Sequence, residues 1–171
     1  LAEGAYYETP VLWASVTGIT AGIDDTHFGP DRPCTRAQVV TFLWRRAGKP
    51  MPANGYNPFE DVPPGSFYEM AVLWAYETGI TAGTDATHFS PNAICNRAQV
   101  VTFLHRFRGC PEPILSAAFS DVPDGSFFHR AVLWATQKEI TYGMGGGKFC
   151  PAQSCTRAQI VTFLYRDAKT A

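Results

Sequence analysis

Three arginines occupy equivalent places in this sequence. They lie in the phrases CTRAQVVTFLWR, CNRAQVVTFLHR and CTRAQIVTFLYR, which begin at Cys34, Cys95 and Cys155. The arginines follow one another at intervals of 61 and 60 residues and are Arg36, Arg97 and Arg157. A guanidinium is permanently charged and presents a fork of N–H donors that matches a carboxylate or a phosphate. The repetition therefore predicts three copies of one anion-binding or ion-pairing site.

Each arginine is predicted to stand at the first position of a helix. Thr35 suits an N-cap, Gln38 completes a capping box, and Cys34 can pack against Val39 as a hydrophobic staple. The same offsets place N-caps at Asn96 and Thr156. A cation at this position costs about 0.3 to 1 kcal/mol relative to an anionic residue, because the helix N-terminus is positive. A guanidinium beside unpaired helix N–H groups is a ready site for a carboxylate or phosphate, so each arginine is hypothesised to bind an anionic ligand.

An ion pair within the protein is the alternative. Each arginine could pair with an acidic residue of a neighbouring repeat, such as Asp61 or Asp121, and so fasten the repeats together. The spacing alone does not decide between the two interpretations.

The whole chain is triplicated. Trp13, Trp74 and Trp134 show the same spacings of 61 and 60 residues as the arginines, and such internal periodicity indicates a repeat architecture. Each copy reads as helix, loop, helix, with repeats at 1–48, 49–109 and 110–171. Leu1 falls on the position of Val62, so repeat one is expected to be truncated and the chain to be a piece of a longer protein.

Local signals predict where the helices begin and end. In the second copy Ser66 is the expected N-cap of the first helix, Glu69 completes a capping box, and Gly79 ends the helix. In the first copy Thr9 before Pro10 predicts a later start. The second helix carries its apolar residues on one stripe, at Val100, Phe103 and Leu104. One helix pair cannot bury its own apolar face, so the copies are expected to pack on each other, as an open stack or closed about a pseudo-threefold axis.

The composition indicates a compact globular protein. Hydrophobic residues make up 46% and charged residues 17% of the 171 residues, and the net charge is −1. No stretch has the basic character that nucleic acid binding needs, so nucleic acid is not expected as a partner. No stretch is apolar over the roughly 20 residues of a membrane helix, and the first residues do not resemble a signal peptide.

Candidate catalytic and metal-binding groups are not apparent. No nucleophile is paired with an oriented base, and the histidines and cysteines lack the spacings of a zinc site, so we expect neither enzyme activity nor a cofactor. Cys150 and Cys155 are close enough for a local disulfide, although Cys155 also fits the staple position. The three repeated tryptophans are expected to pack in the core. Aromatic residues near the start of the first helices could line a groove: Tyr7, Tyr68 and Phe128.

The combined motifs resemble a known family. F.DV at Phe59–Val62 and again at Phe119–Val122, AV.WA, GIT.G at Gly79–Gly83, F.P at Phe89–Pro91 and TRAQ occur in this order. They are similar to the S-layer homology domain, whose signature ends in Thr-Arg-Ala-Glu, over nearly all of the chain. The resemblance implies an all-α pseudo-trimer around a central three-helix bundle. It also implies grooves that bind a secondary cell-wall polysaccharide, typically through a pyruvate ketal.

Function and site residues follow from this resemblance. It implies a non-covalent anchor that holds a larger secreted protein, through a fused upstream domain, on the outside of a bacterial cell wall. The rival interpretation is a structural or protein-interaction module whose arginines form internal salt bridges. The resemblance assigns ligand binding to the three arginines, to a loop glycine of each repeat and to the helix caps. These residues are Arg36, Arg97, Arg157, Gly22, Gly83, Gly143, Thr35, Asn96 and Thr156.

The sequence departs from the family pattern in three ways. The glutamate of the motif is a glutamine, at Gln38, Gln99 and Gln159, which removes a negative charge beside the arginine. Cysteines replace the aliphatic residue before the motif. In the third copy Glu139 stands where a helix-ending glycine is expected, and Lys148 replaces a histidine. The three grooves are therefore expected to differ in affinity.

Overall fold

The all-α prediction of three helix–loop–helix repeats is confirmed. The computed structural model describes residues 2–170, and within that range it contains no β-strand, only isolated bridges. The helices are α1 (Glu8–Val16), α2 (Arg36–Arg46), α3 (Glu69–Glu77), α4 (Arg97–Phe107), α5 (His129–Gln137) and α6 (Arg157–Lys169). No helix in the described part of the chain has the length and apolarity that a membrane crossing needs.

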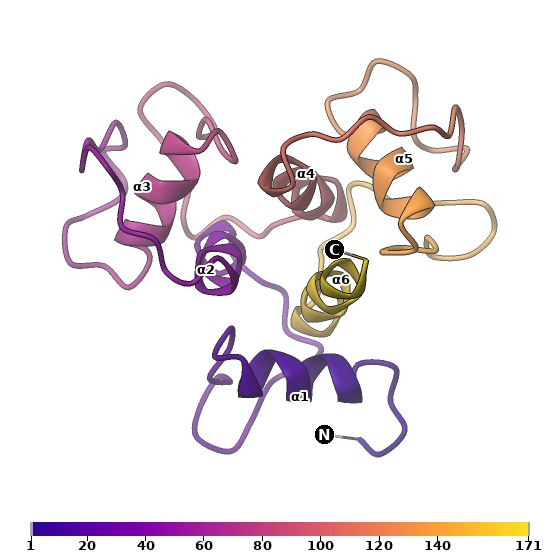
Figure 1. Ribbon diagram of the computed structural model, residues 1–171, viewed down its shortest axis with the longest axis horizontal. Coiled ribbons are helices and arrows are strands. Elements are labelled where there is room, and N and C mark those ends of the chain that lie inside the picture. The colour runs from indigo at the N-terminus through magenta and orange to yellow at the C-terminus, as the bar shows by residue number, and fades with distance from the viewer. Residues whose placement is uncertain (1, 171) are drawn as a thin grey trace.

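The three second helices form a central bundle. Figure 1 shows α2, α4 and α6 around the middle of the molecule, with α1, α3 and α5 outside them. The side chains that meet inside the bundle are large, aliphatic and almost completely buried: Val39, Leu43, Val100, Leu104, Ile160 and Leu164. Of the two packing modes that the repeats allowed, the closed pseudo-threefold arrangement is the one adopted.

Each outer helix packs mainly on the inner helix of the preceding repeat. Helix α3 lies against α2, α5 lies against α4, and α1 lies against α6. Because α1 belongs to the first copy and α6 to the third, this exchange closes the ring. The three copies are therefore one folding unit rather than three independent domains.

Three cysteines join the repeats near the pseudo-threefold axis. Cys95 N–H donates to the carbonyl of Cys34 (2.9 Å), Cys155 N–H to that of Cys95 (3.1 Å) and Cys34 N–H to that of Cys155 (3.3 Å). All three side chains are fully buried. The predicted packing role of these residues is confirmed, and their backbone closes a cyclic set of hydrogen bonds between the copies.

The second helices begin as predicted. Gln38 N–H donates to the Thr35 hydroxyl (3.3 Å), and Thr35 N–H donates to the Gln38 side-chain oxygen (3.0 Å). Asn96 with Gln99, and Thr156 with Gln159, form the same reciprocal capping box. Replacing the motif glutamate with glutamine therefore preserves the local start of the helix.

The predicted starts of the first helices are wrong. Helix α3 begins at Glu69 with no side-chain cap, and the Ser66 hydroxyl is buried without a partner. Instead, Glu69 N–H donates to the Ser66 carbonyl (3.1 Å) and the Glu69 carboxylate accepts from Gly65 N–H (2.7 Å). The tight turn thus pairs Glu69 N–H with a backbone carbonyl, and this N–H is the group that would have donated to the hydroxyl of an N-cap serine. The predicted end is confirmed, because Gly79 follows the helix with φ +74°.

Repeat one starts its helix in the same register as the others, not later. Helix α1 begins at Glu8, the counterpart of Glu69, with Glu8 N–H donating to the Ala5 carbonyl (2.9 Å). Pro10 then lies within the first turn. A proline is tolerated there because the N–H groups of the first turn have no partner within the helix.

The tryptophan prediction is confirmed, and of the two alternatives for Cys155 the structure shows the packing role rather than the disulfide. Trp74 and Trp134 are buried, and Trp13 packs edge-on against Tyr165 at 5.6 Å between ring centroids. Cys150 and Cys155 are both free thiols. Cys155 is committed to the core, while the backbone N–H of Cys150 donates to Asp121 (2.8 Å).

The cysteines are expected to react at very different rates. Burial raises the pKa of Cys34 to about 11 and that of Cys95 to about 12, and also raises the pKa of Cys155. Thiolate is the reactive form, so at pH 8 iodoacetamide should label these three at least about a hundredfold more slowly than the exposed Cys110. Mass spectrometry with and without urea measures this, all five thiols being labelled in urea. Rapid labelling of Cys95 in the native protein would contradict the packing described.

Candidate functional site

Each motif arginine reaches into the next repeat. Arg36 Nε donates to the carbonyl of Phe89 (2.9 Å), and its guanidinium lies over the rings of Phe89 (4.8 Å) and Phe103 (5.3 Å). Arg97 makes the same contacts with Phe149 and Phe163. Arg157 closes the ring on the first copy through Phe28 and Phe42. The arginines therefore join neighbouring copies through a hydrogen bond and cation–π contacts.

The helix N-terminus beside each arginine is not free. Arg36 N–H donates to the carbonyl of Ala93 (2.9 Å) and Ala37 N–H donates to that of Pro91 (3.1 Å). Together with the capping box, these bonds use the first three N–H groups of α2, and the other two copies repeat the pattern. The unpaired N–H groups expected at the helix start are not present, because the neighbouring loop covers it and accepts their hydrogen bonds.

The alternative of ion pairs with Asp61 and Asp121 is not what the structure shows. The Asp61 carboxylate accepts from Phe89 N–H (2.8 Å) and Ser90 N–H (2.7 Å), and Asp121 accepts from the N–H groups of Phe149 and Cys150, both at 2.8 Å. Each aspartate is thus used to shape its own loop. Within residues 2–170 no motif arginine is ion-paired with a carboxylate.

The three guanidiniums are nevertheless deeply buried. Arg36, Arg97 and Arg157 keep only 4%, 2% and 3% of their surface exposed, and burial lowers the pKa of each. Arg36 Nη2 is buried with no hydrogen-bond partner, while Arg157 Nη2 donates to Thr20 (3.1 Å). A buried cation without a counter-ion is costly, and donor capacity remains at the ends of the guanidiniums.

Two of the arginines line open grooves between copies. The groove that contains Arg36 has a volume of about 390 Å³, and the groove that contains Arg97 has about 370 Å³. We call them the Arg36 groove and the Arg97 groove. The first is lined by Arg36, Thr81, Gly83, Thr84, Gln99, Thr102, Phe103, Arg106 and Phe127. The second is lined by Tyr6, Arg97, Thr141, Tyr142, Gly143, Met144, Gln159, Thr162, Phe163 and Arg166.

These grooves also contain a second set of arginines, which the motifs did not single out. Arg106 Nη1 donates to the carbonyl of Ile80 (3.2 Å) and Arg166 Nη1 to that of Ile140 (3.1 Å). Arg45 holds the equivalent position in repeat one, with a bond to Ile19 (3.2 Å). The signal was present, because these residues show the spacings of 61 and 60 that singled out the motif arginines. Each groove therefore presents two cations.

The groove aromatics lie one position before those expected. Tyr6 and Phe127 line the Arg97 and Arg36 grooves, whereas Tyr7, Tyr68 and Phe128 pack partly buried against the core. Tyr6 and Phe127 are 60% and 66% exposed. Tyr6 belongs to repeat one and Phe127 to repeat three. In both grooves the aromatic residue comes from the copy that contributes neither the motif arginine nor the loop, so these two grooves are assembled from all three copies.

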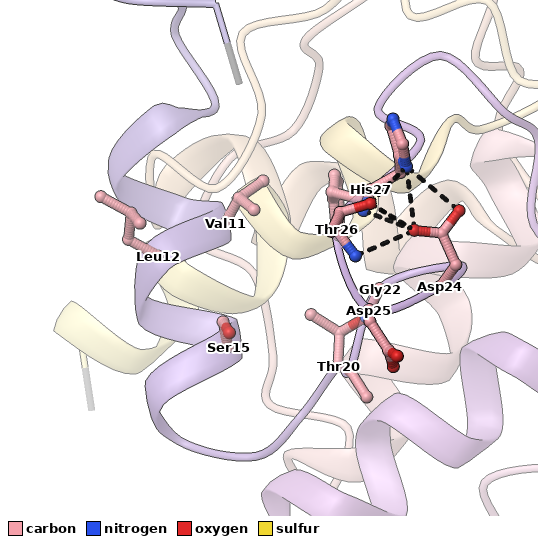
Figure 2. A pocket seen from close by; sticks show the side chains of 11 residues that line it. Val11, Leu12, Ser15, Thr20, Gly22, Asp24, Asp25, Thr26 and His27 are labelled. Carbon is pink, nitrogen blue, oxygen red and sulfur yellow. Dashed lines mark hydrogen bonds and ion pairs between the residues drawn. The ribbon is translucent and has the colours of Figure 1, made fainter.

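The loop glycines are required by the loops themselves. Gly22 has φ +86°, and a Cβ there would lie 2.6 Å from the carbonyl oxygen of His27 and 2.8 Å from that of Asp24. Figure 2 shows this loop, in which the Asp24 carboxylate accepts from the N–H groups of Thr26 (2.9 Å) and His27 (2.8 Å). Gly83 and Gly143 also line the Arg36 and Arg97 grooves. The predicted caps Thr35, Asn96 and Thr156 line neither of these two grooves.

The pocket in Figure 2 lies within repeat one and is lined by Gly22 and Thr20, the counterparts of Gly83 and Thr81 in the Arg36 groove. It is formed by α1 and the loop of repeat one, including Val11, Leu12 and Asp24, and no motif arginine lines it. Leu12 is 53% exposed, whereas its counterparts Leu73 and Leu133 are buried. In repeats two and three the segments containing Phe59 and Phe119 fold over the equivalent loop. Among the described residues, repeat one has no such segment.

The sequence matches a family model three times. The model of the S-layer homology domain matches residues 2–40, 58–101 and 118–161, one segment in each helix–loop–helix copy and together more than half of the chain. The chain belongs to the S-layer homology family. This match confirms the resemblance found from the motifs. The chain is a cell-surface anchoring module.

Similar proteins carry this S-layer homology module within longer chains. A cell surface protein of Thermoanaerobacter kivui is 32% identical over 111 residues, which are 63% of this chain and 15% of that protein. An amylopullulanase of Thermoanaerobacterium thermosulfurigenes is 29% identical over 154 residues, 86% of this chain and 8% of that protein. Exoglucanase XynX of Acetivibrio thermocellus is 27% identical over 154 residues, 86% of this chain and 14% of that protein. The module is thus a minor part of the relatives named as enzymes.

Proposed function

We propose that this module anchors its parent protein by binding an anionic wall glycan in the grooves between repeats. The observation that carries the proposal is the set of three buried guanidiniums without a carboxylate partner among the described residues. Burying an unpaired cation costs free energy, and a bound anion would offset that cost. Each arginine donates from Nε to a backbone carbonyl. Nη2 of Arg97 and Nη2 of Arg157 also donate to threonine hydroxyls, at 3.5 and 3.1 Å. The remaining Nη donors, including the unpartnered Nη2 of Arg36, are those available for this role.

The chemistry of the grooves favours a carboxylate carried by a sugar. In the Arg36 groove, Arg36 and Arg106 supply two positive charges, and Gln99 supplies an amide where the family pattern has a glutamate. The Gln99 oxygen already accepts from Asn96 N–H (3.0 Å), which leaves its NH₂ group to donate. The threonine hydroxyls and the exposed Phe127 ring suit the polar edge and the apolar face of a sugar. A pyruvate ketal on a secondary cell-wall polysaccharide combines these features.

Binding at more than one groove would strengthen the anchor. The three copies place equivalent arginines around one axis, and a polysaccharide repeats its ligand along its length. Once one groove is occupied, binding at the next becomes an intramolecular event with a high effective concentration. Modest affinity at each groove would then suffice to hold a larger protein, which we propose is fused upstream of this module.

Wall binding is expected to depend on both the ketal and the arginines. We expect purified bacterial wall sacculi that carry pyruvylated polysaccharide to pull down the module, and mild acid that removes the ketals to lower the bound fraction by at least about tenfold. Changing Arg36, Arg97 and Arg157 together to lysine should give a similar loss, because a point charge cannot replace the guanidinium fork.

The acid treatment keeps this test informative if the variant folds poorly. Circular dichroism and thermal melting check the fold of the lysine variant, and the arm with ketal-free sacculi uses the wild-type module alone. If folded wild type binds treated and untreated sacculi equally, the ketal is not the ligand. If it binds neither, the anchoring mechanism proposed here fails.

A further inference from the structure

The Arg36 and Arg97 grooves share a floor but differ in one wall. Each has a motif arginine, a second arginine, a glutamine and a threonine at equivalent positions. Tyr142 stands beside the Arg97 groove where its counterpart in repeat two is Ala82. The difference changes the character of the groove, because it adds a second exposed aromatic ring where the Arg36 groove has one.

Tyr142 is exposed at the Arg97 groove rather than buried in the core. The residue is 64% exposed, and the guanidinium of Arg166 lies 4.8 Å from the centroid of its ring. The residues on either side are fixed, since Thr141 is 1% exposed and its hydroxyl accepts from Gly143 N–H (3.2 Å). A rigid backbone and a stacked cation reduce the freedom that the ring would lose on binding.

The Arg97 groove is also the one that has tyrosines from two repeats. Tyr6, from the first copy, is 60% exposed and packs edge-on against Tyr7 with ring centroids 5.1 Å apart. The Arg36 groove has a single exposed ring, Phe127. Tyrosine combines an apolar face with a hydroxyl, which suits a pyranose ring with its C–H face and polar edge.

We propose that the Arg97 groove is the stronger sugar-binding groove of the two and that Tyr142 is its specificity-determining residue. In this arrangement Arg97 and Arg166 hold the carboxylate, and a pyranose ring stacks on Tyr142. The inference rests on the proposed function. It adds which groove binds more tightly, and that the pyranose ring is the part of the ligand that sets the difference in affinity. Covering one face of an aromatic ring, roughly 50 Å² of apolar surface, corresponds to about a tenfold change in dissociation constant.

Reciprocal substitutions test this inference within one molecule. Gly83 lines the Arg36 groove and Gly143 lines the Arg97 groove, so their amide signals in a ¹H–¹⁵N NMR spectrum report each groove separately. The probe is a methyl glucopyranoside carrying a 4,6-linked pyruvate ketal. In the wild type we expect the Gly143 signal to reach its midpoint at about a tenfold lower probe concentration than the Gly83 signal. Tyr142→Ala should abolish this difference, and Ala82→Tyr should lower the Gly83 midpoint.

The controls separate this inference from the proposed function. Sodium pyruvate has no sugar ring, so it should shift both glycine signals with equal midpoints. Equal midpoints with the ketal probe in the wild type, or an unchanged difference in Tyr142→Ala, overturn the role of Tyr142 and leave the proposed function standing. If the ketal probe moves neither signal, both proposals fail.

Discussion

Replacing Asp167 with alanine is expected to lower the free energy of unfolding by about 3 to 5 kcal/mol, which is typical for breaking a buried ion pair. The Asp167 side chain is 1% exposed and pairs with both Arg46 and Arg108. Arg108 Nε donates to the two carboxylate oxygens at 2.9 and 3.0 Å. Removing the carboxylate would leave two neighbouring guanidiniums, 11% and 29% exposed, without their counter-ion. Urea unfolding with a constant slope measures the change.

This ion cluster occurs at one end of the bundle and breaks its threefold symmetry. Arg46, Phe107 and Asp167 occupy equivalent positions in the three inner helices, and the Arg46 guanidinium lies 5.4 Å from the centroid of Phe107. Three different residues therefore occupy one layer of the bundle, with Arg46 in contact with both the Phe107 ring and the Asp167 carboxylate. Because Asp167 connects α6 to the other two inner helices, it holds the third copy in the closed ring.

An exposed ion pair provides the matched control. Arg130 and Glu112 also pair, but their side chains are 56% and 75% exposed. Glu112→Ala is expected to change the free energy of unfolding by less than about 1 kcal/mol, since solvent screens such pairs. If Asp167→Ala proved as mild as Glu112→Ala, the cluster would not fasten the ring.

Local signals in the sequence were sufficient for the inner helices. A threonine or asparagine cap with a glutamine three residues later satisfies its bonds within four residues, so no distant contact competes. The start of α3 carries the similar pattern of Ser66 and Glu69, yet the turn before it uses the same groups differently. Two arrangements of one local motif were available, and packing of the turn decided between them.

The partners of the arginines could not be found from residue types. Residue types suggest a carboxylate partner for Arg36, and the actual partner is the backbone carbonyl of Phe89 in the next repeat. Every residue has a carbonyl, so no sequence pattern marks this acceptor. The phenylalanine was visible in the F.P motif, but its contact with the guanidinium depends on how the loop closes over the neighbouring helix. The ring arrangement itself followed from the repeat spacing and the family resemblance.

The loop glycines show that a correct residue choice can have another reason. The family resemblance assigns them to ligand binding, and the structure shows that the loop itself requires glycine at these positions even without a ligand. At Gly83 the backbone has φ +87°, and a Cβ would lie 2.6 Å from the carbonyl oxygen of His88 and 2.6 Å from the Phe59 ring. Ligand contact at Gly83 and Gly143 remains part of the proposed function, because both line grooves.

Gly83→Ala is therefore expected to destabilise the protein by about 4 kcal/mol or more, in the range reserved for severe strain and overpacking. The left-handed backbone alone costs an L-residue about 1 to 2 kcal/mol. The remainder comes from the contact with backbone oxygens, which cannot move aside like a flexible side chain. Thr84 N–H donates to the same His88 carbonyl (2.7 Å), so relieving the clash would break the bond that closes the loop. Urea unfolding and thermal melting measure the loss.

Gly65→Ala separates the clash from the backbone strain. Gly65 has φ +79°, close to that of Gly83, but a Cβ there would meet nothing within 4 Å. This variant should lose only the backbone contribution of about 1 to 2 kcal/mol. Equal losses in the two variants would mean that the loop relaxes around the new methyl group. A larger loss for Gly83→Ala would show that the glycine is fixed by the fold, so that weak wall binding by this variant could not be taken as evidence of a lost sugar contact.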